Sequence, residues 1–211
     1  MAKIKSSKKA SSVDMTAMCD VAFLLLTFFI LTATAKVPEA LPVDTPAATN
    51  ESKLPERDLA TLTIGGKGKV FLGLSDRPTR RRTLELMAQK FTVTFTPEEL
   101  DKFELMDTFG VPIQGMSSLI AMKSADRNLA GVQAGIPKDS LDNQLKEWIY
   151  NARIATKEIS EASGLKGVEL KVAIKGDAKE QYPAIQKVMD ILQDQQINNF
   201  NLVTSLRGKD F

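Results

Sequence analysis

The apolar stretch at residues 14–35 limits the fold of this chain more than any other feature. Its sequence is DMTAMCDVAFLLLTFFILTATA, and the fifteen residues 21–35 carry no charge. Leucine and phenylalanine would cover all sides of a helix here, so the stretch has no polar face to turn toward water. It must therefore be a membrane span, a cleaved signal peptide or a fully buried helix.

Length favours a membrane span only when Asp20 is included. The uncharged run alone would span about 22 Å as a helix, less than the roughly 30 Å hydrocarbon core of a bilayer. A helix that starts at Met15 would span about 31 Å, but it contains Asp20. We expect a retained transmembrane helix at residues 14–36. A cleaved signal peptide stays open, because Ala33 and Ala35 form an A-x-A-like site after the apolar run.

The charges before the apolar stretch indicate its orientation. Residues 1–13 contain four lysines and no acid. These lysines are Lys3, Lys5, Lys8 and Lys9. Basic flanks of this kind stay on the cytoplasmic side. We therefore expect a cytoplasmic basic tail at residues 1–13 and a large C-terminal domain in the periplasm of a bacterium, anchored in the inner membrane.

Composition excludes several classes of function. Residues 36–211 carry equal numbers of basic and acidic residues, and only 6% of the chain is aromatic, so no basic footprint for nucleic acid is present. The chain has no histidine and one cysteine, Cys19. This excludes intrachain disulfides, His-ligated metal sites and Ser–His–Asp triads. No other catalytic constellation stands out, so we expect no enzyme, no cofactor and no metal.

Asp20 is the most informative residue of the apolar stretch. An ionised, unpaired aspartate near the middle of a membrane helix would cost about 2.5–3.5 kcal/mol. No Lys, Arg or His lies between Lys9 and Lys36 to neutralise it. Asp20 must therefore be protonated, close to water, or paired with another chain.

Threonines follow Asp20 along one side of the expected helix. Thr16, Thr27 and Thr34 fall on the same helical stripe as Asp20. Hydroxyls beside a carboxyl could line a route for a proton or another cation. The alternative is that these hydroxyls bond carbonyls of their own helix or pack against a partner helix.

The membrane segment resembles that of the ExbD/TolR biopolymer-transport family. The resemblance rests on Asp14, Thr16, Asp20, Val21, Leu24, Leu25, Leu26 and Phe28. It implies a single membrane helix with an essential aspartate, and this role maps onto Asp20. The family usually has proline after the threonine, where this chain has Ala17, so the start of the helix is open.

The resemblance implies an ExbD-like subunit of an inner-membrane motor. Such a motor uses the proton-motive force to energise TonB-dependent transport across the outer membrane. The implied partners are the lipid bilayer, an ExbB-like multi-span protein as a pentamer around a dimer of this chain, and a TonB-like client. The proton is the family's usual ion, and sodium stays open. Two alternatives remain: a TolR-like subunit for envelope integrity, and an anchored periplasmic binding domain in which Asp20 only assists assembly.

The rest of the chain predicts a linker and one domain. Prolines at positions 38, 42, 46 and 55 indicate a flexible linker at residues 37–56. Residues 57–211 predict an α+β domain with a small sheet packed with two or more helices. Apolar runs at 59–64 and 70–74 flank a glycine-rich turn and predict a β-hairpin.

Periodicity predicts the remaining elements of the domain. A capping box at Thr96 and Glu99 marks a helix start, with the helix ending near residue 107. Further predicted elements are helices at 140–159 and 182–195 and strands at 168–175 and 200–206.

Three further features of the domain carry weaker expectations. Residues 76–139 look like an insertion relative to the compact family domain. Arg80, Arg81 and Arg82 are expected on the surface, in water or against anionic lipid. Lys157 and Glu161 are expected to form an i,i+4 surface ion pair.

Overall fold

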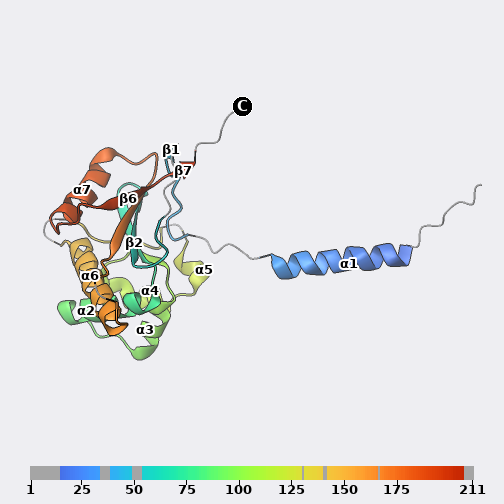
Figure 1. The fold of residues 1–211 in the computed structure, drawn as a ribbon, viewed down its shortest axis with the longest axis horizontal. Helices are drawn as coiled ribbons and strands as arrows, with labels where there is room; N and C mark the ends of the chain where they lie inside the picture. The colour runs from blue at the N-terminus through green and yellow to red at the C-terminus, as the bar shows by residue number, and fades with distance from the viewer. Residues whose placement is uncertain are drawn as a thin grey trace, which may run out of the picture. The chain divides into compact units, whose positions relative to one another are not determined.

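The computed structural model describes residues 15–33, 39–48, 54–129, 131–139, 142–165 and 167–206. The chain divides into two compact units, Met1–Val37 and Pro38–Phe211. The first unit contributes one helix, α1 (Met15–Thr32), and the second holds a mixed sheet packed with helices (Figure 1). This arrangement confirms the predicted class of an apolar N-terminal helix followed by an α+β domain.

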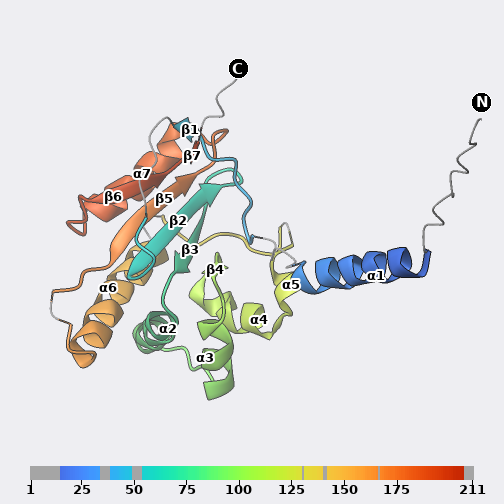
Figure 2. The same ribbon diagram turned by 45° about the vertical axis from the view of Figure 1, so that its right-hand side comes forward.

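Five strands form the central sheet, with β4 at one edge and β6 at the other (Figure 2). In sheet order they are β4 (Thr108–Phe109), β3 (Lys69–Leu74), β2 (Leu59–Gly65), β5 (Lys171–Gly176) and β6 (Phe200–Val203). The β2–β3 and β3–β4 pairs are antiparallel, whereas β5 runs parallel to both β2 and β6.

The β2–β3 hairpin confirms the prediction from the glycine-rich turn. Gly65 pairs with Lys69, and Gly66, Lys67 and Gly68 between them all have positive φ angles, of 58°, 70° and 79°. Two glycines in such a turn avoid the steric cost that a Cβ meets in the left-handed region. The local sequence therefore fixes both the turn and the register of the two strands.

Parallel strands require a long connection, and here it is helical. Between β3 and β5 the chain forms α2 (Arg77–Phe91), α3 (Pro97–Glu104), a 3₁₀ turn (Ile113–Gly115), α4 (Met116–Ala121), α5 (Ser124–Arg127) and α6 (Gln144–Ala162). A second helix, α7 (Tyr182–Gln193), connects β5 to β6. In both views α2, α3 and α4 group at the end of the sheet opposite α7 (Figures 1 and 2).

The segment predicted as an insertion, residues 76–139, contributes to the core of the domain. Phe103 and Phe109 are buried beside Trp148 of α6. The ring centroid of Phe109 lies 4.7 Å from that of Trp148 and 5.1 Å from that of Phe103. Removing this segment would take away both phenylalanines and uncover Trp148, so the segment is structurally integral.

Two predicted helices form with their expected capping and buried faces. Thr96 and Glu99 make the capping box at the start of α3. The helix predicted at 140–159 begins at Gln144, because Asn143 accepts a hydrogen bond from the Lys146 amide and caps it there. Its apolar positions Leu145, Trp148, Ala152 and Ala155 are buried, and Leu141 lies outside the described residues.

Residues 39–48, within the predicted linker, contact the domain. Glu39 forms a salt bridge with Lys175 at 2.7 Å, and the Asp44 carbonyl accepts a 2.7 Å hydrogen bond from the Ala178 amide. Further along, the two-residue strand β1 (Ala47–Ala48) pairs in parallel with β7 (Ser205–Leu206). This part of the predicted flexible linker is therefore attached to the sheet region.

The predicted final strand, 200–206, is divided between two sheets. β6 joins the central sheet beside β5, and β7 pairs with β1. The strand predicted at 168–175 begins its pairing only at Lys171, where β2 also begins, because residues 168–170 extend beyond the end of β2. Val172 and Ile174 are buried as predicted.

Arg80 differs from the surface role predicted for the arginine cluster. Its side chain is buried and donates to the carbonyls of Leu74, Ser75 and Glu104 at 2.6, 3.2 and 3.1 Å. Desolvation lowers the pKa of Arg80, opposed in part by the nearby Asp107 carboxylate. Arg80 therefore joins the end of β3 to the end of α3.

Arg81 and Arg82 bridge helices at the surface. Arg81 contacts Asp101 of α3, and Arg82 contacts Glu158 of α6 at 2.7 Å. Opposite charges on neighbouring helices thus satisfy both guanidinium groups. The arrangement supports a structural role for the cluster and leaves no need for lipid contact.

We predict that Arg80→Met destabilises the domain by about 2–4 kcal/mol, because three buried carbonyls lose their donor. The neighbouring control Arg81→Met should cost less than about 1 kcal/mol, since its ion pairs are exposed. Urea unfolding of the full chain in detergent, followed by fluorescence of the sole tryptophan, Trp148, measures both. Equal costs for the two variants would contradict the buried role of Arg80.

Asp58 offers a test with the opposite sign. Burial, and then repulsion from Asp76, raise the pKa of Asp58 above its usual value. Its backbone φ is +53°, a conformation that asparagine also tolerates. A raised carboxyl pKa means that ionisation opposes folding, so the stability present at low pH is lost as pH rises through the folded-state pKa.

We predict that Asp58→Asn raises the melting temperature at neutral pH by about 1–2 °C. At pH values near 3, where the carboxyl of Asp58 is itself largely neutral, the gain should vanish. Thermal unfolding of both proteins at the two pH values checks this. A gain that is independent of pH would show that charge is not its cause.

Candidate functional site

The strongest candidate site lies on α1, and it depends on the continuity of that helix. The eighteen residues Met15–Thr32 form one uninterrupted helix of about 27 Å (Figure 1). None of its residues is buried within the described structure, and by length and composition it could cross a membrane. An apolar surface of this extent needs lipid or protein around it.

The described helix, Met15–Thr32, covers most of the span predicted at residues 14–36. It ends at Thr32, although the Ala33 amide still donates to the Phe29 carbonyl at 2.8 Å. Residues 14 and 34–36 lie outside the described residues, and so does the candidate Thr34. Its predicted place on the polar stripe therefore has no structural test.

Asp20 is the sole charged residue of α1 and occupies its sixth position. Because the helix is continuous, Thr16 and Thr27 share one stripe with Asp20. All three are thus brought to one side, as the spacing predicts. The remainder of the helix surface is mostly leucine, phenylalanine and other apolar side chains.

Threonine hydroxyls on α1 bond to their own backbone. Thr27 donates to the Leu24 carbonyl at 2.9 Å, and Thr32, which lies off the stripe, donates to the Phe28 carbonyl at 2.7 Å. This is one of the two interpretations of the threonines. A hydroxyl that donates its proton keeps its oxygen lone pairs as acceptors, so Thr27 could still accept from water or a protonated carboxyl.

The chemistry available on α1 is a change of charge at one carboxyl. A carboxyl can be neutral or negative, and the two forms differ greatly in their tolerance of hydrocarbon. Among the described residues, no three His, Cys, Asp or Glu side chains gather in a way that could hold a metal ion. Asp20 is therefore suited to carrying a proton between two environments.

A pocket on the domain was not predicted from the sequence. It lies beside α6 and the segment that leads into β5, and it has a volume of about 470 Å³. Its walls come from side chains on successive turns of a helix and from the chain that follows. No compact motif joins these residues, so the sequence carries no signal of the pocket.

Comparison with protein families matches residues 6–207 to the family described as biopolymer transport protein ExbD/TolR. No curated protein matches the chain, and no solved structure matches it. The family match includes α1 with Asp20, the central sheet and the helical segment at 76–139. Because the match spans nearly the whole chain, the protein belongs to the ExbD/TolR family of biopolymer-transport proteins.

Proposed function

We propose that this protein is an ExbD-like subunit of an inner-membrane motor, and that Asp20 carries protons in it. The motor would use the proton-motive force to energise TonB-dependent transport across the outer membrane. The observation that carries the proposal is one ionisable carboxyl on an otherwise apolar helix that is long enough for a membrane. The family match supports the assignment to a transport-energising subunit, which does no covalent chemistry.

The cost of a charge in hydrocarbon limits where an ionised Asp20 can lie. An ionised aspartate would cost about 2.5–3.5 kcal/mol at the centre of a membrane helix. The nearest basic residues in sequence are Lys9 and Lys36, eleven and sixteen positions away. When ionised, the carboxyl must therefore lie close to water or face polar groups of another chain. An ExbB-like multi-span protein, as a pentamer around a dimer of this chain, would provide them.

Alternation between the two charge states of Asp20 would produce movement. The neutral acid can face apolar partner surfaces, whereas the carboxylate is held at polar ones. One charge that crosses 100 mV releases about 2.3 kcal/mol, which is enough to bias rotation between packed helices. Thr16 and Thr27, on the same stripe, would supply hydroxyl oxygens along the path, as would Thr34.

Orientation follows from the lysine-rich residues 1–13. A cytoplasmic tail places residues 38–211 in the periplasm, where a TonB-like client could be reached. Protons would then enter from the periplasmic side and leave toward the cytoplasm. The family includes ExbD and TolR, so a TolR-like role in envelope integrity differs only in the client that is driven.

We predict that Asp20→Asn abolishes ion-coupled work while the membrane complex still assembles. Asparagine has a similar shape but cannot exchange a proton. Energised uptake of an iron complex through the outer membrane measures the work, and co-purification with the multi-span partner measures assembly. The neighbouring variant Cys19→Ser should retain uptake. Normal uptake by Asp20→Asn would overturn the proposed mechanism, and lost assembly would point to the alternative in which Asp20 only assists assembly.

We predict that Thr27→Val slows proton flux through the reconstituted complex several-fold, because valine keeps the shape and removes the acceptor oxygen. Thr32→Val is the matched control, since it loses a similar backbone hydrogen bond off the stripe. Flux is measured in vesicles with a pH-sensitive dye, with and without sodium. Equal flux in both variants would remove Thr27 from the path, and flux that requires sodium would replace the proton as the ion.

A further inference from the structure

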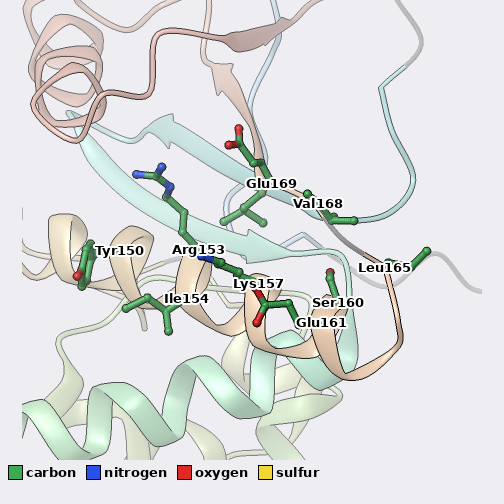
Figure 3. Close-up of a pocket in the computed structure, with 11 residues that line it drawn as sticks. Tyr150, Arg153, Ile154, Lys157, Ser160, Glu161, Leu165, Val168 and Glu169 are labelled. Carbon is green, nitrogen blue, oxygen red and sulfur yellow. The ribbon is translucent and has the colours of Figure 1, made fainter.

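The pocket beside α6 combines charged walls with an apolar lining. Figure 3 shows Arg153, Lys157 and Glu161 on successive turns of α6, with Glu169 on the segment that leads into β5. The cavity of about 470 Å³ is in the size range of small-molecule sites. It lies wholly within the Pro38–Phe211 unit, so its geometry is independent of α1.

Apolar side chains form the other part of the lining. They are Ile154, Leu165, Val168 and Leu170. Leu165 is 59% exposed, which is high for a large aliphatic side chain next to a cavity. Contact with a ligand would remove part of this surface from water, which favours binding.

The charged groups of the pocket are not neutralised within the described structure. The ion pair predicted between Lys157 and Glu161 does not form, and neither residue has a salt bridge to any described residue. The same holds for Arg153 and Glu169. In contrast, Arg82 on the neighbouring α2 is fully engaged with Glu85 and Glu158.

One hydrogen bond positions the Arg153 guanidinium and leaves its other N–H donors available. One of its terminal nitrogens donates to the Gln195 carbonyl at 3.0 Å, which ties the guanidinium to the chain after α7. A guanidinium has five N–H donors, so donors remain for a carboxylate. This hydrogen bond already restricts the Arg153 side chain in the free protein, so binding an anion here costs less conformational entropy.

We propose that this pocket binds a short zwitterionic peptide of about dipeptide size with an apolar side chain. Arg153 and Lys157 would receive its carboxylate, and Glu161 and Glu169 its ammonium group. The apolar lining would cover its side chain. Two cations and two carboxylates that share a cavity yet do not pair are complementary to a ligand that carries both charges, and a ligand with one charge would leave half of them unmatched.

The test uses the full chain in lipid nanodiscs and the dipeptide Leu-Leu as the probe. Calorimetry or ¹⁵N NMR titration should show saturable binding, with signals of α6 and residues 167–170 shifting. N-acetyl-Leu-Leu-amide, which lacks both charges, should bind at least tenfold more weakly. Asp20→Asn should bind the dipeptide normally, so a failure of the motor proposal does not affect this result.

Two variants separate the two ends of the ligand. Lys157→Gln should weaken binding of N-acetyl-Leu-Leu, which keeps the carboxylate, and leave Leu-Leu-amide unaffected. Glu161→Gln should do the reverse, because the amide keeps the ammonium group. Neither side chain forms a hydrogen bond or salt bridge with another described residue, and Lys187→Gln on α7 is the control that should change neither.

Three results would overturn the proposal. The first is no saturable binding of Leu-Leu, and the second is equal binding of the capped and free peptides. The third is a pattern in which Lys157→Gln does not selectively weaken the peptide with a free carboxylate, or Glu161→Gln the peptide with a free ammonium group. Equal binding of the capped peptide would instead indicate a groove for an extended segment of a protein. Unchanged melting temperatures of both variants would ensure that the losses are not caused by unfolding.

Discussion

The parallel pairing of β2 with β5 is the constraint on which the rest of the domain depends. It joins residues 59–64 to residues 171–176 and so encloses about half of the chain in one connection. Parallel strands cannot be joined by a tight turn, and the connection must be packed somewhere. Strands β3 and β4 and the helices α2 to α6 form that connection, and the aromatic cluster of Phe103, Phe109 and Trp148 joins α3, β4 and α6.

The membrane helix α1 and the domain accommodate charged side chains in different ways. In α1 most side chains are apolar, and the one charged group is a carboxyl. In the domain, by contrast, the buried charge of Arg80 is matched locally by three carbonyls and the Asp107 carboxylate, at 3.3 Å. A charge on a membrane helix with no match in its own chain indicates function, whereas a buried charge that is matched indicates architecture.

Local chemistry made several elements predictable from the sequence. The hairpin follows from glycines that need positive φ angles, and α3 from its capping box. Asp20 was identifiable because its cost depends only on hydrophobicity and length. Its stripe with Thr16 and Thr27 required only helical spacing. These features depend on residues close in sequence, which is why one sequence is enough to find them.

Other elements could not be predicted because distant partners define them. The buried face of α2 includes Thr79, Arg80 and Thr83. Its apolar periodicity is therefore weak, and its sequence is typical of an exposed segment. The pairing of β1 with β7 joins two-residue strands more than 150 positions apart. The pocket likewise depends on how residues 165 and 167–170, which follow α6, pack beside that helix. The expected Lys157–Glu161 pair did not indicate a pocket.

Strand order also affects how the protein is made. β2 and β3 leave the ribosome about a hundred residues before β5, which at 5–20 residues per second is a delay of about 5–20 s. A hairpin forms in microseconds, so it waits through this interval with Leu62, Ile64 and Leu72 uncovered. Such apolar strand edges are prone to wrong pairing until β5 pairs with β2.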